Sequence, residues 1–183
     1  MVTMKTPKLQ SPPIRFKATI EKVGDWSIIE LPTEASLQLP SRGLVMVEGT
    51  IDGRPFQSPL EPDGKKGHWL RVEKSMTDAT VGDSVSLEIR PSSEWPEPSI
   101  PDDLQAALSH APPEYAVWKA STTIARWDWI RWIRATNNPE TRKKRIEVAL
   151  SKMRGGSRRP CCFDRASCTQ PDVSKSGVLL TRI

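Results

Sequence analysis

Hydrophobic and polar residues alternate along the first half of the chain with the period of two that is typical of β-strands. Apolar residues at positions 14, 16, 18 and 20 alternate with polar ones, which predicts a strand with one buried face. Further strands are predicted over residues 26–31, 44–51, 56–60, 68–72 and 84–90, with a short helical turn over 32–39. Asp52 and Gly53 favour a tight hairpin turn. Six short strands at this spacing predict a small antiparallel β-barrel, closed or half closed, over residues 12–91.

The pattern changes after residue 91. Residues 91–101 contain four prolines, which exclude regular structure and predict a stiff, extended connector over 92–100. Beyond it, apolar residues recur at helical spacing and predict helices over 102–109, 114–120, 122–135 and 139–154. The predicted fold class is therefore α+β, an N-terminal small antiparallel β-barrel followed by a C-terminal helical module over 101–157.

The ends of the later helices are well marked. Ser121 is expected to cap the third helix, and Asn138 caps the fourth, with Pro139 at its first position. Gly155 is expected to take the left-handed conformation that ends this helix. Residues 158–183 are expected to form an irregular, cationic tail that contains the cysteines.

Composition narrows the class of protein. With 183 residues, 37% hydrophobic and 27% charged, the chain has a globular composition. No apolar run approaches the roughly 20 residues needed to span a bilayer, and residues 1–13 lack the core of a signal peptide. We therefore expect a cytoplasmic protein without membrane insertion. Cys161, Cys162 and Cys168 are expected to be reduced thiols, and their spacing does not match zinc ligands, so no metal or cofactor is expected.

Positive charge gathers in the second half, where residues 101–183 hold 15 basic and 8 acidic residues. Arg142 and Arg145 are neighbours on the first turn of the last helix, and Arg158 and Arg159 follow a glycine pair that allows the chain to turn back. Guanidinium groups match carboxylate or phosphate in pairs, so these four arginines are a candidate anion-binding site. The alternative is that Arg142 belongs to a structural ion pair and the others are solvated.

Tryptophans dominate the third predicted helix. Trp127, Trp129 and Trp132 spread over more than half of its circumference, so one face is expected to pack inside the helical module. The remaining aromatic surface is expected to pack between the domains, with Trp95 of the connector as its partner.

No catalytic residues can be assigned. His68 is expected on the barrel surface and His110 at a helix C-terminus, and neither has an obvious Ser, Cys or Asp partner. The sequence contains no glycine-rich phosphate loop and no HExxH motif. An enzyme with an unrecognised site at the junction of barrel and helices stays a third alternative.

Several motifs resemble one known family. Residues 95–98 and 100–104, together with the capped basic helix, resemble the bacteriocin-protection family, also called YdeI/OmpD-associated. Residues 49–53 and 81–85 look like the hairpin and the last-strand entry of a small barrel domain of unknown function that commonly precedes this module.

The resemblance implies a noncatalytic cytoplasmic accessory protein that helps bacteria withstand bacteriocins or envelope stress by binding a protein or peptide. The runner-up is an anion or nucleic-acid binder that uses the basic helix, although no nucleic-acid recognition signature accompanies the charge. Exposed barrel edges also favour a homodimer.

Overall fold

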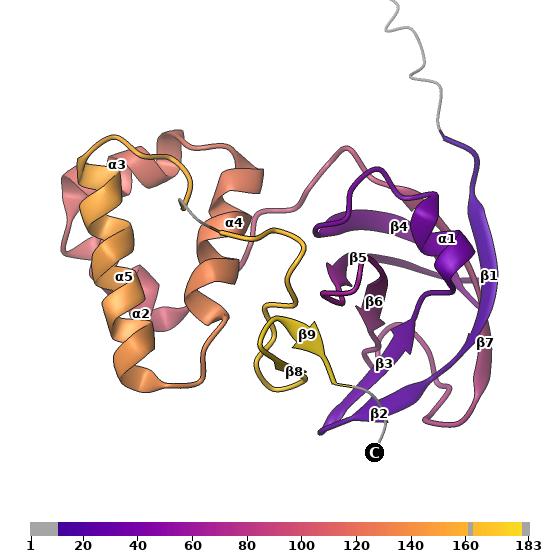
Figure 1. Ribbon diagram of the computed structural model, residues 1–183. Coiled ribbons are helices and arrows are strands. Elements are labelled where there is room, and N and C mark those ends of the chain that lie inside the picture. The colour runs from indigo at the N-terminus through magenta and orange to yellow at the C-terminus, as the bar shows by residue number, and fades with distance from the viewer. Residues whose placement is uncertain (1–10, 161–162, 181–183) are drawn as a thin grey trace, which may run out of the picture.

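The computed structural model describes residues 11–160 and 163–180 and has an α+β architecture. A strongly curled antiparallel sheet is followed by four helices that pack together beside it (Figure 1). Helix α4 (Thr123–Arg134) is the helix nearest the sheet, and the last described segment runs between the two parts (Figure 1).

The sheet is a half-barrel. Its strands are β1 (Ile14–Thr19), β2 (Glu21–Val23), β3 (Trp26–Glu30), β4 (Val45–Ile51), β5 (Arg54–Pro62), β6 (His68–Arg71) and β7 (Ser84–Pro91), with helix α1 (Thr33–Leu37) between β3 and β4. Their spatial order is β1-β7-β4-β5-β6-β3-β2. The two edge strands follow each other in the chain, and only Ile20 separates them. Because one bent segment forms both edges and cannot pair with itself, the predicted barrel does not close fully.

The predicted alternation places the core on the inner side of this sheet. Ile14 and Ile20 are buried, and the inward residues of β7 join them in one cluster. Asp52 and Gly53 have φ angles of 47° and 83°, as the predicted two-residue hairpin turn requires. The sequence pattern missed β2, because three residues are too short for an alternation to be recognised.

The helices are α2 (Asp102–Ser109), α3 (Pro112–Ala120), α4 and α5 (Pro139–Arg154). Predicted and observed bounds agree for α2 and α5. Two details of the predicted caps were wrong. Thr122 caps α4 by accepting from Ala125 N at 3.1 Å, whereas the Ser121 hydroxyl donates back to the carbonyls of α3. The left-handed glycine after α5 is Gly156, with φ of 87°, because Gly155 still continues the last helical turn and donates to Ser151 O.

Residues 92–101 contain no helix or strand, and this connector is bound along α4. The rings of Trp95 and Trp127 meet edge to face with centroids 6.2 Å apart. Trp127 Nε1 donates to Pro96 O at 2.9 Å, and Glu97 forms an ion pair with Arg126 at 2.6 Å. The connector is therefore fixed to the first turns of α4.

The described part of the tail after α5 is irregular apart from one short hairpin. Strands β8 (Ser174–Lys175) and β9 (Val178–Leu179) form a small hairpin. Cys168, Val173 and Leu179 are buried in a cluster with Val23, Ile28 and Trp69 of the sheet. The sequence predictions did not include this hairpin, because the segment has few apolar residues and forms its core only against β2, β3 and β6.

Three glycines on the sheet side make room for the tail backbone. A Cβ atom on Gly24 would lie 3.2 Å from Asp172 O, and one on Gly43 would lie 3.0 Å from Arg165 O. A Cβ atom on Gly64 would overlap the carbonyl of Gly177. The tail backbone therefore lies directly against the loops that connect the strands.

Candidate functional site

One face of α4 carries charged residues toward the sheet and the tail. Asp128, Arg131 and Arg134 recur at intervals of three, so they lie along one side of the helix. Asp128 and Arg131 are buried, and Arg134 is half-buried. The sequence predictions did not include this polar stripe. The signal for it was the charged residues that recur at helical spacing among the tryptophans of α4.

Glu61 of β5 receives contacts from both other parts of the molecule. Arg134 Nη2 lies 2.6 Å from Glu61 Oε1, and Gln170 of the tail donates to the same oxygen at 3.1 Å. Glu61 is itself buried, and its second oxygen has no hydrogen-bond partner among the residues that the structure describes. Sheet, helix and tail thus meet at one buried carboxylate.

Asp128 is paired with the tail. Its Oδ2 atom lies 2.8 Å from Arg165 Nη2, which is close enough for an ion pair, although the N–H is not aligned on that oxygen. Burial raises the pKa of Asp128, and the neighbouring positive charge of Arg165 opposes that shift.

Arg131 lies between these two pairs and is 1% exposed. Its Nη2 donates to Arg165 O at 3.2 Å and to Ser167 O at 3.4 Å, and its Nε has no acceptor within the described ranges. The guanidinium carbon lies 5.2 Å from the ring centroid of Phe163. Burial lowers the pKa of Arg131. Arg131 makes no ion pair within the described part of the chain, although the negative charges of Glu61, Asp128 and Asp164 lie near it.

A cavity of about 190 Å³ adjoins this cluster. Its walls come from the loop between α1 and β4, the connector, α4 and the tail. The lining residues are Ser41, Gly43, Leu44, Trp95, Ile124, Asp128, Arg131 and Arg165. Ser41, Ile124 and Arg165 are exposed, so the cavity opens to solvent on their side.

His68 holds one wall of this cavity. It is 1% exposed, which corrects the expectation that it lies on the barrel surface. The curl of the sheet and α1 cover it: Nε2 lies 2.9 Å from Gly43 O, and Nδ1 lies 2.6 Å from Ser36 Oγ. Since a carbonyl only accepts, Nε2 carries the proton and Nδ1 accepts from the serine hydroxyl. Burial lowers the pKa of His68, so the neutral ring fixes the loop that carries Gly43.

Ser36 Oγ and His68 Nδ1 lie as close together as a catalytic nucleophile and its base. Ser36 is a partner of His68 that the sequence predictions did not include. Both side chains are buried, however, and the second ring nitrogen is bound to the main chain. We therefore assign the pair a structural role. His110 behaves as predicted, with Nδ1 2.8 Å from Ala106 O at the end of α2.

Two of the four arginines predicted to bind an anion are already bound to protein groups. The Arg142 guanidinium contacts both oxygens of Asp103, at 2.6 and 3.0 Å, which raises the pKa of Arg142 and lowers that of Asp103. Arg145 donates to Trp132 O at 2.7 Å and lies over the same residue's ring.

Arg158 and Arg159 are exposed just beyond α5. The carbonyl of Arg158 accepts a hydrogen bond from Trp129 Nε1 at 2.9 Å, which ties the start of the tail to α4. A shared anion site over Arg142, Arg145, Arg158 and Arg159 stays a prediction. Trp129 and Trp132 pack in the helical core, and Trp95 and Trp127 form the contact between connector and helix.

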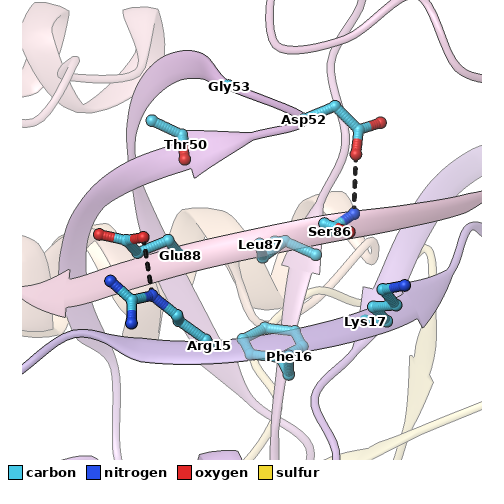
Figure 2. A pocket seen from close by; sticks show the side chains of 9 residues that line it. All are labelled: Arg15, Phe16, Lys17, Thr50, Asp52, Gly53, Ser86, Leu87 and Glu88. Atoms are coloured by element: carbon cyan, nitrogen blue, oxygen red, sulfur yellow. Dashed lines mark hydrogen bonds and ion pairs between the residues drawn. The ribbon is translucent and has the colours of Figure 1, made fainter.

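A larger hollow of about 520 Å³ lies on the outer face of β1 and β7, beside the β4–β5 turn (Figure 2). Arg15 and Glu88 form an ion pair across it at 3.0 Å, and Asp52 Oδ1 accepts from Ser86 N at 2.8 Å (Figure 2). These charged side chains are largely exposed and satisfy each other. The junction cavity, with its buried unsatisfied groups, is therefore the stronger candidate site.

Within residues 11–160 and 163–180, no three His, Cys, Asp or Glu side chains converge in a way that would hold a metal ion. Burial raises the pKa of the Cys168 thiol, so this cysteine is not activated. Cys161 and Cys162 lie outside the described residues. Among the described helices, none has the length and apolarity needed to cross a membrane.

Two family models match the chain. Residues 16–89 match a domain of unknown function (DUF1905), and residues 97–156 match the family described as bacteriocin-protection, YdeI or OmpD-associated. No curated protein matches the chain at a significant level. The description of the second family indicates a role in bacteriocin protection or an association with the envelope. The curled sheet lies in one matched range and the helices in the other, so the chain combines a sheet domain similar to DUF1905 with a helical module similar to the bacteriocin-protection, YdeI or OmpD-associated family.

Proposed function

We propose that this protein is a noncatalytic, cytoplasmic binding protein that takes a protein or peptide partner at the junction of sheet and helices. The observation that carries this proposal is the cavity between four separate chain segments, with Arg131 in its wall, a buried cation that makes no ion pair within residues 11–160 and 163–180. Pockets between domains with a few convergent polar groups are the usual places for ligands.

The chemistry of the wall favours binding over reaction. An arginine stays protonated and does not act as an acid or base, and Asp128 is held in its ion pair with Arg165. Such groups orient and neutralise a ligand. An acyl-transfer role for Ser36 has less support, because its hydroxyl is buried and bonded to His68.

The size of the cavity favours part of a larger partner. At about 190 Å³ it is smaller than the roughly 300–1,000 Å³ of sites that enclose a drug-sized ligand. Trp95 and the exposed Ile124 add apolar surface to the lining. One residue of a partner can therefore enter while the rest of its chain lies outside.

The alternative of a nucleic-acid binder that uses the basic helix has weaker support. Lys143 and Lys144 are exposed on α5, but they line a surface hollow together with Glu140 and Glu147. Mixed charge of this kind weakens the attraction for a phosphate backbone.

The first prediction tests the binding site. Peptides selected from a random library on the full chain are expected to bind roughly tenfold less tightly to Ile124→Ser, because an apolar anchor beside the cavity is lost. Val81→Ser is the matched control, since Val81 is 44% exposed against 39% for Ile124 and does not line this cavity. Calorimetric titration gives both affinities. Failure to select any peptide, or equal weakening by both variants, would contradict the proposed function.

A further inference from the structure

Resting on the proposed function, we infer that the junction cavity recognises the C-terminal carboxylate of a peptide that ends in a small apolar residue. Arg131 is the cation that this carboxylate meets.

The carboxylates near Arg131 are each bound by another group, and that of Asp164 accepts from Ala166 N and Ser167 Oγ. Glu61 is paired with Arg134 at 2.6 Å and Asp128 with Arg165 at 2.8 Å. Arg131 is left with two carbonyl oxygens as acceptors and an unsatisfied Nε. A buried cation without a direct ion-pair partner is costly, and an anion bound in the adjoining cavity offsets that cost.

The walls favour a monoanionic carboxylate over a phosphate. Asp128 lines the same cavity and repels a second negative charge on the ligand. Leu44, Trp95 and Ile124 add apolar surface that a bare phosphate leaves uncovered. The planar guanidinium fork of Arg131 matches a carboxylate in geometry.

A charged wall and an apolar wall lie close together in this small cavity, and this arrangement favours the C-terminal residue of a peptide. A C-terminal residue carries its carboxylate and its side chain on the same carbon, so both walls can be contacted within about 190 Å³. The side chain of an internal Asp or Glu carries a carboxylate but no second, apolar group that could contact the other wall. A free amino acid would bring an ammonium group next to Arg131 and Arg165, whereas a peptide has an uncharged amide at that position.

The experiment titrates the full chain calorimetrically with acetyl-Gly-Gly-Val as the free acid, with the same peptide amidated at its C-terminus, and with acetate. We expect the free acid to bind and the amide to bind roughly 10- to 100-fold less tightly, as the loss of a charge-assisted hydrogen bond predicts. Acetate is expected to bind more weakly than the peptide, because it lacks the apolar side chain.

Variants locate the effect at the cavity. Ile124→Asp and Ile124→Lys both remove the apolar side chain of an exposed lining residue and differ in the charge that they introduce. Ile124→Asp is therefore expected to weaken the free acid more than the amide, and Ile124→Lys is expected to weaken the free acid less than Ile124→Asp does. Val81→Asp is the control for added charge elsewhere on the surface. Arg131→Met should abolish the preference for the free acid; if that variant does not fold, the charge series at position 124 decides the question.

The outcomes separate the inference from the proposed function. If selected peptides bind equally well as acids and as amides, the carboxylate inference is wrong and the peptide-binding proposal stands. Binding of acetate as tight as that of the peptide would overturn the chain-end assignment in favour of a site for small acids. If neither acetyl-Gly-Gly-Val nor any selected peptide binds, both proposals fail.

Discussion

At the scale of single residues, arginine side chains join helices that are far apart in the sequence. Arg142 of α5 forms an ion pair with Asp103 at the start of α2. At the other end of α5, Arg154 lies 2.6 Å from Glu114 of α3. Each arginine lowers the pKa of its carboxyl partner. The two ends of α5 are thus fixed to two different helices.

The substitution Asp103→Asn is expected to destabilise the protein at neutral pH and not in strong acid. Because Arg142 lowers the pKa of Asp103, the pair contributes stability above the ordinary pKa of 3.8, and this contribution is lost as the pH falls through the lowered value. The pair is partly exposed, so we expect a loss of at most about 1 kcal/mol at neutral pH and none in strong acid. Urea unfolding at both pH values measures it. The neighbouring Asp102→Asn is the control, and an equal loss from both would show that the ion pair contributes nothing.

At the scale of elements, the tail acts as a third layer between sheet and helices. Its hairpin completes a buried cluster with β2, β3 and β6, and its earlier part carries Arg165 to Asp128. The close approach at Gly43 and Gly64 leaves no space for side chains between the two backbones. The tail is therefore a structural part of the cavity.

Substitution of Gly64 is expected to release the tail. Gly64→Ala places a Cβ on the carbonyl of Gly177 and strains a φ of 78°. Gly53→Ala is the control, since its φ is 83° and it has open space around it. In a chain with Cys161 and Cys162 replaced by serine, the buried Cys168 should react quickly with a thiol reagent only in Gly64→Ala. Slow labelling in both variants would contradict this role of the tail.

At the scale of the whole molecule, sheet, helices and tail are joined at Glu61. Its carboxylate binds Arg134 of α4 and Gln170 of the tail, and it is the nearby negative charge that most favours the charged form of Arg131. A buried group shared by three parts of the chain makes each part depend on the others. We therefore expect the protein to unfold as one unit.

The prediction at this scale is that Glu61→Gln separates the parts. Removal of one partner of a buried ion pair leaves an uncompensated charge, so we expect a loss of about 3–5 kcal/mol. Thermal unfolding followed by tryptophan fluorescence and far-ultraviolet circular dichroism should change from one shared transition to two. Glu88→Gln breaks the exposed pair with Arg15 and should cost at most about 1 kcal/mol. One unshifted transition in Glu61→Gln would refute the coupling.

The sequence by itself determined the elements whose signals are local. Helix α5 was predicted from Asn138 and Pro139 at its start and a glycine pair at its end, and the strands of the sheet were predicted from alternation and from the turn at Asp52. Caps, turns and periodic faces act over a few residues, so a sequence read along its length reveals them. The family resemblance rests on the same kind of short motif and agrees with both matched ranges.

Only the tertiary structure decided the candidate site. The half-barrel, the burial of His68 and the packed tail depend on segments that meet across the fold, and Arg134 and Glu61 are 73 residues apart. Whether an arginine is solvated, paired or left in excess depends on which carboxylates the fold brings near it, and this cannot be read from its neighbours in the chain. Arg142 finds Asp103 and Arg131 finds no carboxylate of its own in the described chain, although both stand on amphipathic helices. The cavity beside Arg131 exists because the tail returns between two domains.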